Sequence, residues 1–340
     1  MVARLLILLG SFLVILAGSE LFTNGVEWAG HRLELAEAVV GSLLAAVGTA
    51  LPETFIPAMA LLMGTRAPGD PHQAVGIGAI VGAPLMLSTV ALAVMALASL
   101  AYRRRRTQVA LQVSSELTRR DLRFFLPIFL VAVVLGMLPL GETVRRLAAA
   151  GLLCAYAFYA FTMLRLKRDS GSEVEHGLYV ELTFGGDPMA PRGLPIVLQV
   201  VLGVAAILFG AREFVEQVVT LSQHLSLAPG VVSLILSPLA TELPEKYNSV
   251  VWIRQRKDHL ALANITGAMV FQSCIPVALG VAFTPWHLAA PELLAGAIAL
   301  GSAAFLFVNL RDGELHTPSL MAGAAAYGVF LVGLRFLGAL

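Results

Sequence analysis

The sequence predicts an all-α, polytopic membrane protein with ten transmembrane helices in two inverted five-helix repeats. Of its 340 residues, 58% are hydrophobic and only 13% are charged, and the mean hydropathy is +0.82. A soluble domain of this size does not need so much apolar surface. Apolar runs of about 20 residues, the length that crosses a bilayer, recur along the whole chain. Two acidic stretches, residues 48–53 and 240–245, lie 192 residues apart and indicate a repeat.

The same offset of 192 residues aligns positions outside these stretches. It places Gly18 opposite Gly210 and Phe22 opposite Phe214. The N-terminal stretch has the order of a signal peptide, because Arg4 precedes an apolar run that small residues follow. Since Gly18 and Phe22 have partners in the second copy, we predict instead that this stretch is the first transmembrane helix.

Polar connectors divide the chain into its predicted spans. We expect these spans at residues 3–29, 36–64, 73–101, 122–141, 145–165, 193–223, 228–253, 259–283, 289–309 and 318–338. The first five-helix repeat then covers residues 1–165, and the second covers residues 193–340. The connecting loop covers residues 166–192, and within it residues 178–184 have the composition of a short strand.

The distribution of Lys and Arg predicts the orientation of the chain. Sixteen of these residues lie in or beside loops that follow odd-numbered spans, and three lie after even-numbered spans. Because positive loops remain in the cytoplasm, both termini are expected outside, across a bacterial inner (plasma) membrane. Five spans in each repeat give the second repeat the opposite orientation. Transporters of this plan place their binding site at the repeat interface near the midplane.

The two acidic stretches carry the residues from which we predict a binding site. Glu53 and Glu245 each follow a proline within an apolar run. Thr49 and Thr241 precede these glutamates by four residues and share their helix faces. Carboxylates inside a membrane are costly and commonly mark ion or proton paths. A proline kink with a glutamate satisfied by a neighbouring helix is the alternative, but matching positions in two inverted copies favour an ion site.

The prolines also release backbone carbonyl groups, because proline has no amide hydrogen to donate. The carbonyls of Gly48 and Ala240 lie four residues before the two prolines and need another partner or a polar cavity. Carboxylate, hydroxyl and carbonyl oxygens are hard ligands, of which Ca²⁺ takes about six to eight. Two ionised glutamates also neutralise one divalent ion. We therefore expect Glu53 and Glu245 to be the metal ligands.

The two stretches resemble the alpha-repeats of the sodium/calcium exchanger family, the cation/Ca²⁺ antiporters. That family has a Gly-Thr-Ser-Leu-Pro-Glu type motif in the second span of each repeat. The resemblance covers both repeats, and it implies that the matched glutamates bind Ca²⁺ and the counter-ion in turn. The matched positions are Thr49, Glu53, Thr241 and Glu245.

The third span of each repeat carries a degraded form of the family's second motif, Gly-Asn-x-x-Gly-Ser-Asn-x-x-Asn/Asp. The positions that still match are Gly78, Gly82, Asn264 and Gly267. Both motif serines are alanine, and the final polar ligand is Leu87 in repeat one and Gln272 in repeat two. Several ligands for Na⁺ are therefore missing. Gln272 is a candidate amide-oxygen ligand, and Asn264 either ties helices together or lines the path.

Repeat two also contains a charged pair that repeat one lacks. Glu242 precedes Lys246 by four residues, a favourable helical spacing, and their counterparts are Ala50 and Thr54. One interpretation is an internal ion pair. Another is that Glu242 is a third ion or proton ligand, because close carboxylates raise one another's proton affinity. We also hypothesise that Lys246 is a fixed cation in the place of one Na⁺.

These features predict a secondary antiporter that exchanges Ca²⁺, or a similar cation, for Na⁺ or H⁺ by alternating access. The alternative is a non-transporting or channel-like membrane protein built on the same repeats. An enzyme is not expected, because no histidine is predicted at bilayer depth to form a nucleophile–base pair or a metal cluster. We expect inorganic cations and the lipid bilayer as partners, and neither a cofactor nor nucleic acid. The counter-ion, the stoichiometry and the oligomeric state stay open.

Overall fold

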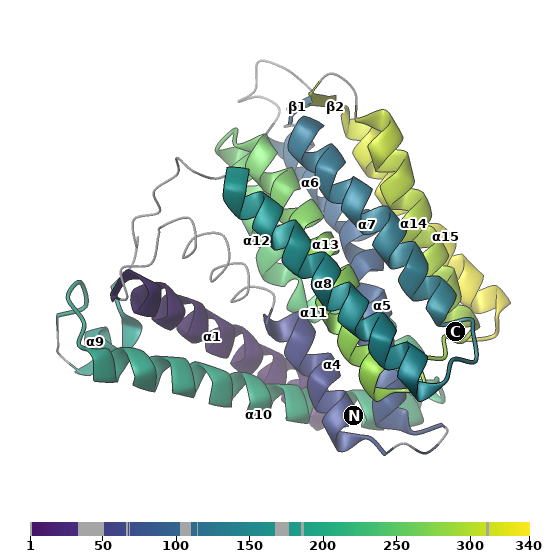
Figure 1. The fold of residues 1–340 in the computed structure, drawn as a ribbon, viewed down its shortest axis with the longest axis horizontal. Helices are drawn as coiled ribbons and strands as arrows, with labels where there is room; N and C mark the ends of the chain where they lie inside the picture. The colour runs from purple at the N-terminus through teal and green to yellow at the C-terminus, as the bar shows by residue number, and fades with distance from the viewer. Residues whose placement is uncertain are drawn as a thin grey trace.

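The computed structural model describes residues 2–32, 51–65, 67, 69–102, 110–113, 115–166, 177–184, 187–310 and 313–340. The described part is almost entirely helical, as predicted (Figure 1). In the first half the elements are α1 (Val2–Arg32), α4 (Leu51–Met63), α5 (Pro71–Met86), η2 (Leu87–Ala91), α6 (Leu92–Ala101), β1 (Leu111–Gln112), α7 (Ser115–Leu135) and α8 (Glu142–Leu166). After them come α9 (Tyr179–Phe184), α10 (Gly193–Leu225), α11 (Pro229–Thr241), α12 (Leu243–Arg254), α13 (Asp258–Phe283), α14 (Ala290–Asn309), β2 (Glu314–Leu315) and α15 (Thr317–Phe336).

Seven helical segments among the described residues are long and apolar enough to cross a membrane. They are α1, the run from α5 to α6, α8, α10, α13, α14 and α15. Helices α4 and α11 are shorter and apolar, and α7 completes an order that is consistent with the ten predicted spans. Large apolar side chains such as Leu6, Leu194 and Phe336 are exposed on α1, α10 and α15, as expected where a helix contacts lipid.

Helix α7 begins earlier than predicted, at Ser115 instead of residue 122. Its first two turns contain charged residues, which an apolar-run criterion excludes although they form a regular helix. Those turns are anchored inside the protein: the Asp121 carboxylate accepts hydrogen bonds from Tyr159 of α8 at 2.9 Å and from Thr266 of α13 at 2.6 Å. The buried acid is thus fully paired and joins three helices.

The third span is not one regular helix, because a π-helical turn, η2, separates α5 from α6. Pro84 lies just before this turn and has no amide hydrogen for the preceding helical turn. The Ser88 hydroxyl donates to the Pro84 carbonyl at 2.7 Å, and Thr89 donates to the Leu85 carbonyl at 2.5 Å. These hydroxyl groups provide hydrogen-bond donors to the backbone carbonyls of the widened turn. A π-helical turn is a form of distortion often found at functional sites.

Helices α1 and α10, the first helices of the two repeats, lie side by side at one flank of the molecule (Figure 1). They pack closely through glycine. A Cβ atom on Gly18 would lie 2.9 Å from the Gly203 carbonyl oxygen and from the Ile207 amide nitrogen. A Cβ atom on Gly210 would lie 2.8 Å from the Ser11 carbonyl oxygen and 3.1 Å from the Ile15 amide nitrogen.

These two sets of contacts are related by the offset of 192 residues, which takes Ser11 to Gly203 and Gly18 to Gly210. Gly18 and Gly210 therefore contact equivalent backbone positions on the opposite helix. Such reciprocal contacts are the property of two copies packed about a pseudo-two-fold axis, as inverted repeats require. The repeat boundaries at residues 165 and 193 stay a prediction.

Helices α5 and α11 also approach closely, and this contact accounts for two glycines of the degraded motif. Side chains at Gly78 and Gly82 would overlap the carbonyl oxygens of Gly230 and Leu234 on α11. Pro238 leaves the Leu234 carbonyl without a helical donor, so Gly82 covers the carbonyl that proline released. Glycine is needed here for backbone contact between the repeats.

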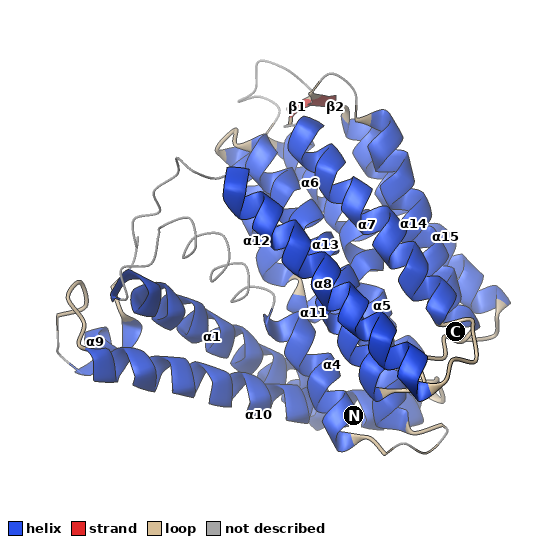
Figure 2. Ribbon diagram, in the orientation of Figure 1, coloured by secondary structure: helices blue, strands red, loops and turns tan. Residues whose placement is uncertain are grey.

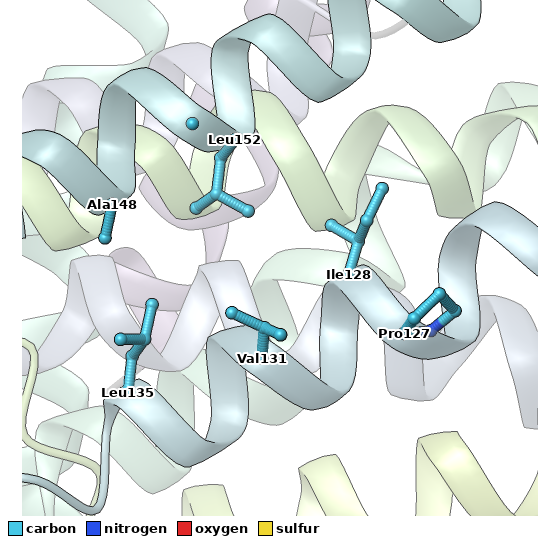
Figure 3. Close-up of a pocket in the computed structure, with 7 residues that line it drawn as sticks. Pro127, Ile128, Val131, Leu135, Ala148 and Leu152 are labelled. Atoms are coloured by element: carbon cyan, nitrogen blue, oxygen red, sulfur yellow. The ribbon is translucent and has the colours of Figure 1, made fainter.

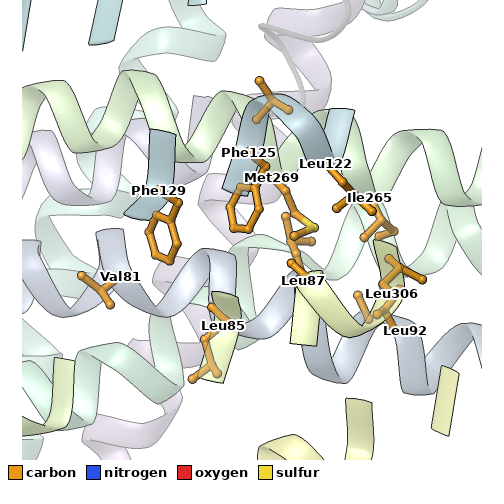
Figure 4. Close-up of a cluster of buried hydrophobic side chains, with 14 of the residues drawn as sticks. Val81, Leu85, Leu87, Leu92, Leu122, Phe125, Phe129, Ile265, Met269 and Leu306 are labelled. Carbon is orange, nitrogen blue, oxygen red and sulfur yellow. The ribbon is translucent and has the colours of Figure 1, made fainter. Parts of the chain in front are cut away.

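The main apolar core lies beside this contact and is formed by both repeats. Figure 4 shows side chains of α5 to α7 interleaved with those of α13 and α14. Phe125 and Phe129 stack with their ring centroids 5.2 Å apart, and Ile265 and Met269 of α13 are fully buried in the same cluster. A core shared in this way holds the two copies in a fixed register.

A single short strand pair joins two connectors in the described part of the chain (Figure 2). Leu111 pairs with Leu315 and Gln112 with Glu314, in antiparallel register. One strand follows the third predicted span and the other follows the ninth, so these two loops lie at the same end of the molecule. The predicted topology also places odd-numbered loops on one side, whereas which side is cytoplasmic stays a prediction.

Residues 178–184 do not form the strand expected from their composition, because α9 is a helix over Tyr179–Phe184. Two other helices satisfy its first turn. The Asn24 side chain of α1 accepts the Tyr179 amide at 3.3 Å, and the Gln199 side chain of α10 accepts the Val180 amide at 2.8 Å. Side-chain oxygens thus cap the helix from outside, and no strand partner is needed.

Candidate functional site

The two central glutamates occupy equivalent places in the two repeats. Glu53 lies in the first turn of α4, and Glu245 lies in the first turn of α12. A proline precedes each glutamate at the second helical position, where a missing amide hydrogen costs little. Carboxylates are favoured at a helix N-terminus because the unpaired amides there carry partial positive charge. The Pro-Glu sequence therefore provides a local reason for an acid at bilayer depth.

Helix α12 begins only two residues after α11 ends, and Glu242 is the residue between them. The predicted span 228–253 is therefore broken in two. Pro244 has no amide with which to continue the ladder to the Ala240 carbonyl, and Glu242 leaves helical geometry with φ −89° and ψ 12°. Thr241, the last residue of α11, is 2% exposed beside this break. In repeat one, Thr49 is the predicted counterpart of Thr241 and Gly48 that of Ala240, and both lie outside the described residues.

Four buried side chains around this break have oxygen atoms without a hydrogen-bond partner among the described residues. The unpaired atoms are Oε1 and Oε2 of Glu53, Oε2 of Glu245, Oε1 of Glu242 and Oε1 of Gln272. None of the four residues is more than 5% exposed. Buried oxygens are normally paired, so these unpaired oxygens mark a place where a bound ion or water can supply the partner. A hard cation binds oxygen atoms of these types.

The charged groups of the site lie within electrostatic range of one another. Glu53 of repeat one interacts with Glu242, Glu245 and Lys246 of repeat two. The candidate site therefore combines residues of both predicted repeats, which is the arrangement expected for inverted repeats. No group of three or more Asp, Glu, His or Cys side chains arranged to hold a metal ion occurs within the described ranges. Cation binding would thus rest mainly on two carboxylates, with further oxygens from neighbouring groups.

The structure pairs Glu242 with Lys246, as one of the two sequence interpretations proposed. Lys246 Nζ lies 3.2 Å from Glu242 Oε2, with the ammonium 7% and the carboxylate 0% exposed. The same ammonium donates to the Pro238 carbonyl at 3.4 Å. Because Glu242 Oε1 has no partner among the described residues, the ion pair leaves one oxygen free for a ligand.

The two polar residues of α13 have different surroundings. Gln272 lies against the Glu242 carboxyl group, with its own carbonyl oxygen unpaired in the described part of the chain. Asn264 donates from Nδ2 to the Glu245 backbone carbonyl at 3.4 Å and is partly exposed. Gln272 is thus placed as a ligand candidate. Asn264 ties α13 to α12, which was one of its two predicted roles.

Some residues near the site were not singled out from the sequence. Ser233 and Ser237 precede Thr241 at four-residue intervals and are buried on the same face of α11 as the predicted ligands. The Ser233 hydroxyl lies 2.9 Å from that of Ser237 and donates to the Val75 carbonyl at 2.6 Å. The four-residue spacing in the sequence is enough to predict that these serines share a helix face with Thr241. No sequence pattern indicates Tyr327 of α15, which interacts electrostatically with Glu242, because only the fold brings the two residues together.

An apolar pocket between α7 and α8 is separate from these residues (Figure 3). Its lining contains no charged or polar side chain and consists of Pro127, Ile128, Val131, Leu135, Ala148, Gly151 and Leu152. A cation has no ligand there. The candidate site is the group of buried polar side chains at the α11–α12 break.

Comparison with known proteins supports the family resemblance that the two acidic motifs indicate. The family model described as sodium/calcium exchanger protein matches residues 4–165 and 195–336, which is most of the chain. The chain belongs to the sodium/calcium exchanger family. As a member of this family it is a membrane transporter of the cation-exchanger class and an integral membrane protein.

Two curated relatives of this exchanger span nearly its whole length. It is 24% identical to the putative antiporter CaxA of Alkalimonas amylolytica over 99% of this chain and 98% of that protein. It is 23% identical to the inner membrane protein YrbG of Escherichia coli (strain K12), over 88% of this chain and 86% of that protein.

Two solved structures share the fold of this exchanger. One is the H⁺/Ca²⁺ exchanger CAX, with a TM-score of 0.72 and 18% identity, over 98% of this chain and 82% of the other. The other is the sodium-calcium exchanger NCX_Mj soaked with Na⁺ and Ca²⁺, with a TM-score of 0.60 and 20% identity, over 98% and 99%. Identities this low establish the shared architecture alone.

Proposed function

We propose that this exchanger is a secondary antiporter that moves Ca²⁺ against Na⁺ or H⁺ by alternating access. The observation that carries the proposal is the pair Glu53 and Glu245, one from each inverted repeat, buried with unpaired oxygens. Two ionised carboxylates match the charge of one divalent cation. Glu242, Gln272 and Thr241 would add uncharged or charge-balanced oxygens, and the Ala240 carbonyl is a further candidate. Asn264 would position Glu245, and Thr49 and the Gly48 carbonyl would act as the repeat-one counterparts.

The two glutamates also offer a physical reason for tight coupling. Two unpaired carboxylates are costly to enclose in a low-dielectric interior. The unloaded protein would therefore resist passing through the occluded state, whereas either substrate neutralises the site and allows it. Coupled exchange needs a transporter that changes its open side only when a substrate is bound, since otherwise the ion gradient is dissipated without exchange.

The missing third-span hydroxyls favour H⁺ over Na⁺ as the counter-ion. A proton needs one carboxylate oxygen, whereas a bound Na⁺ needs a shell of several oxygens. Ala83 and Ala268 replace the serines of the motif, and Leu87 replaces its final ligand. Of the two solved structures with this fold, one is an H⁺/Ca²⁺ exchanger and the other a sodium-calcium exchanger, so the choice of H⁺ rests on the residues of this chain. We place the protein in a bacterial inner membrane with both termini outside.

The test is Ca²⁺ flux into proteoliposomes under an imposed pH gradient alone or a Na⁺ gradient alone. We expect flux with the pH gradient, and its loss in Glu53→Gln and in Glu245→Gln, because each substitution removes one of the two charges that balance Ca²⁺. Glu142→Gln, at the exposed start of α8, is the matched control and should retain flux.

Two results would contradict the proposal. Full Ca²⁺ flux in both site variants would overturn the site. Flux of wild-type protein that needs no counter-ion gradient and is not accelerated by one would instead indicate a channel-like protein. Size-exclusion profiles of the purified variants separate lost transport from lost folding.

A further inference from the structure

The site contains one more buried charge pair than binding a divalent cation requires. Glu53 and Glu245 supply two negative charges, whereas Glu242 and Lys246 add one of each sign. Repeat one has neither an acid nor a base at the equivalent positions, which are Ala50 and Thr54. The second repeat has therefore acquired a buried ammonium inside the site without changing its formal charge.

The position of the ammonium is fixed from two sides. Lys246 Nζ is held by Glu242 Oε2 at 3.2 Å and by the Pro238 carbonyl at 3.4 Å, across the break between α11 and α12. The same group interacts electrostatically with Glu53, from the other repeat. A cation bound covalently to the chain at this place neutralises a carboxylate but cannot leave with the substrate.

We propose that Lys246 is a tethered counter-ion which sets the exchange at one divalent cation for two monovalent cations, so that transport is electroneutral. This inference rests on the antiport function proposed above. Charges enclosed in a low-dielectric interior are costly unless they are paired, so each occluded state of the wild-type site is expected to be close to neutral. With Glu242 balanced by Lys246, Glu53 and Glu245 leave two charges to be met, by one divalent ion or by two monovalent ions.

The pair also explains how Glu242 contributes an oxygen to the site without adding a negative charge that the bound cations must neutralise. Its Oε1 atom is unpaired within the described residues and Gln272 lies beside it. Glu242 therefore provides an oxygen to the cargo while Lys246 cancels its charge. If the lysine were absent, three carboxylates would face the cargo, and a third monovalent cation would be needed to neutralise them.

Stoichiometry is measured at static head in proteoliposomes, where the Ca²⁺ gradient is balanced against a set counter-ion gradient and a K⁺ diffusion potential. For wild-type protein we expect the Ca²⁺ gradient to equal the square of the counter-ion gradient and to be independent of voltage. In Lys246→Met, three monovalent cations would neutralise the three carboxylates, whereas one Ca²⁺ would leave one negative charge unmatched. We expect slower exchange that carries one net charge per cycle, so its balanced Ca²⁺ gradient should shift about tenfold for each ~59 mV.

The double variant Lys246→Met with Glu242→Gln removes one charge of each sign and restores the balance. We expect it to return to voltage independence even if its rate falls. Lys257→Met removes the same charge from an exposed residue after α12 and should behave as wild type. Purification of each variant as a monodisperse species checks its folding, and if Lys246→Met fails this check, the wild-type and double-variant measurements decide.

The outcomes distinguish this inference from the function on which it rests. Wild-type Ca²⁺ exchange that depends on voltage, or a voltage-independent Lys246→Met, would overturn the tethered counter-ion and leave the antiport function standing. Absence of counter-ion-driven Ca²⁺ flux in wild-type protein would overturn the antiport function itself.

Discussion

Gln272 is the residue that we propose to link the substrate to the charged pair. Its carbonyl oxygen is unpaired among the described residues, and its side chain lies against Glu242. The sequence identified it through alignment of the degraded motif, since Gln272 is the one polar side chain left at the final ligand position. Sequence alone could not predict the contact with Glu242, because that contact depends on how α13 packs across the helix break.

At the residue scale we predict that Gln272→Ala weakens Ca²⁺ binding and changes turnover less. A polar contact to a charged group contributes about 1.5–3 kcal/mol, which corresponds to roughly a 10- to 150-fold increase in KM. Initial rates of Ca²⁺ uptake against Ca²⁺ concentration measure this effect. Gln223→Ala, at the exposed end of α10, is the matched control. An unchanged KM would remove Gln272 from the ligand set.

The helices were easier to predict than their interruptions. Apolar runs predict the spans, and Pro52 and Pro244 mark the places within them where an acidic residue follows. An apolar-run criterion starts α7 too late because its first, charged turns are also helical. Composition favours a strand where α9 forms, because the groups that cap this helix come from α1 and α10. In each case the deciding interaction joins residues far apart in sequence, which local composition does not record.

At the element scale we predict that the reciprocal glycines of α1 and α10 are equally sensitive to substitution. Gly18→Ala and Gly210→Ala each place a methyl group under 3.0 Å from backbone atoms that cannot rotate away. Overpacking of this kind typically costs about 1–3 kcal/mol. Thermal unfolding of the purified protein in detergent should show a lower Tm for both variants.

The control for this prediction lies on the same helix. A Cβ atom on Gly10 meets no atom within 4 Å, so Gly10→Ala gains helix propensity without a clash. Its Tm should be equal to or above that of the wild type. If Gly18→Ala were as stable as Gly10→Ala, the close α1–α10 contact would be wrong.

The whole molecule is organised by inversion, which the odd number of spans in each repeat predicted. The strand pair β1–β2 joins a connector of the first repeat to one of the second, and Figure 1 shows it at one end of the bundle. Both connectors follow odd-numbered spans, so their proximity agrees with a topology derived from loop charge. Absolute orientation depends on the membrane, and it is therefore predicted from Lys and Arg alone.

At this scale we predict that the C-terminus after α15 lies outside the cytoplasm. A fusion of alkaline phosphatase to Leu340 should be active in cells, whereas a fusion of green fluorescent protein at the same place should be dark. Fusions within the connecting loop, after Lys167, should give the opposite pair of signals. Fluorescence at the C-terminus would invert the assigned orientation and exchange the two faces of the site.

The ion pair at the helix break also limits how the two repeats could have diverged after duplication. Introducing an acid at position 242 alone would leave a buried carboxylate without a partner, and introducing a base at position 246 alone would leave a buried ammonium. Breaking a buried pair in this way costs about 3–5 kcal/mol, a large fraction of a protein's stability. Fixing the two substitutions together, or through a neutral polar intermediate, avoids this cost. Relatives of this chain are expected to have both charges or neither, so sequencing more of them tests the pairing without a single transport assay.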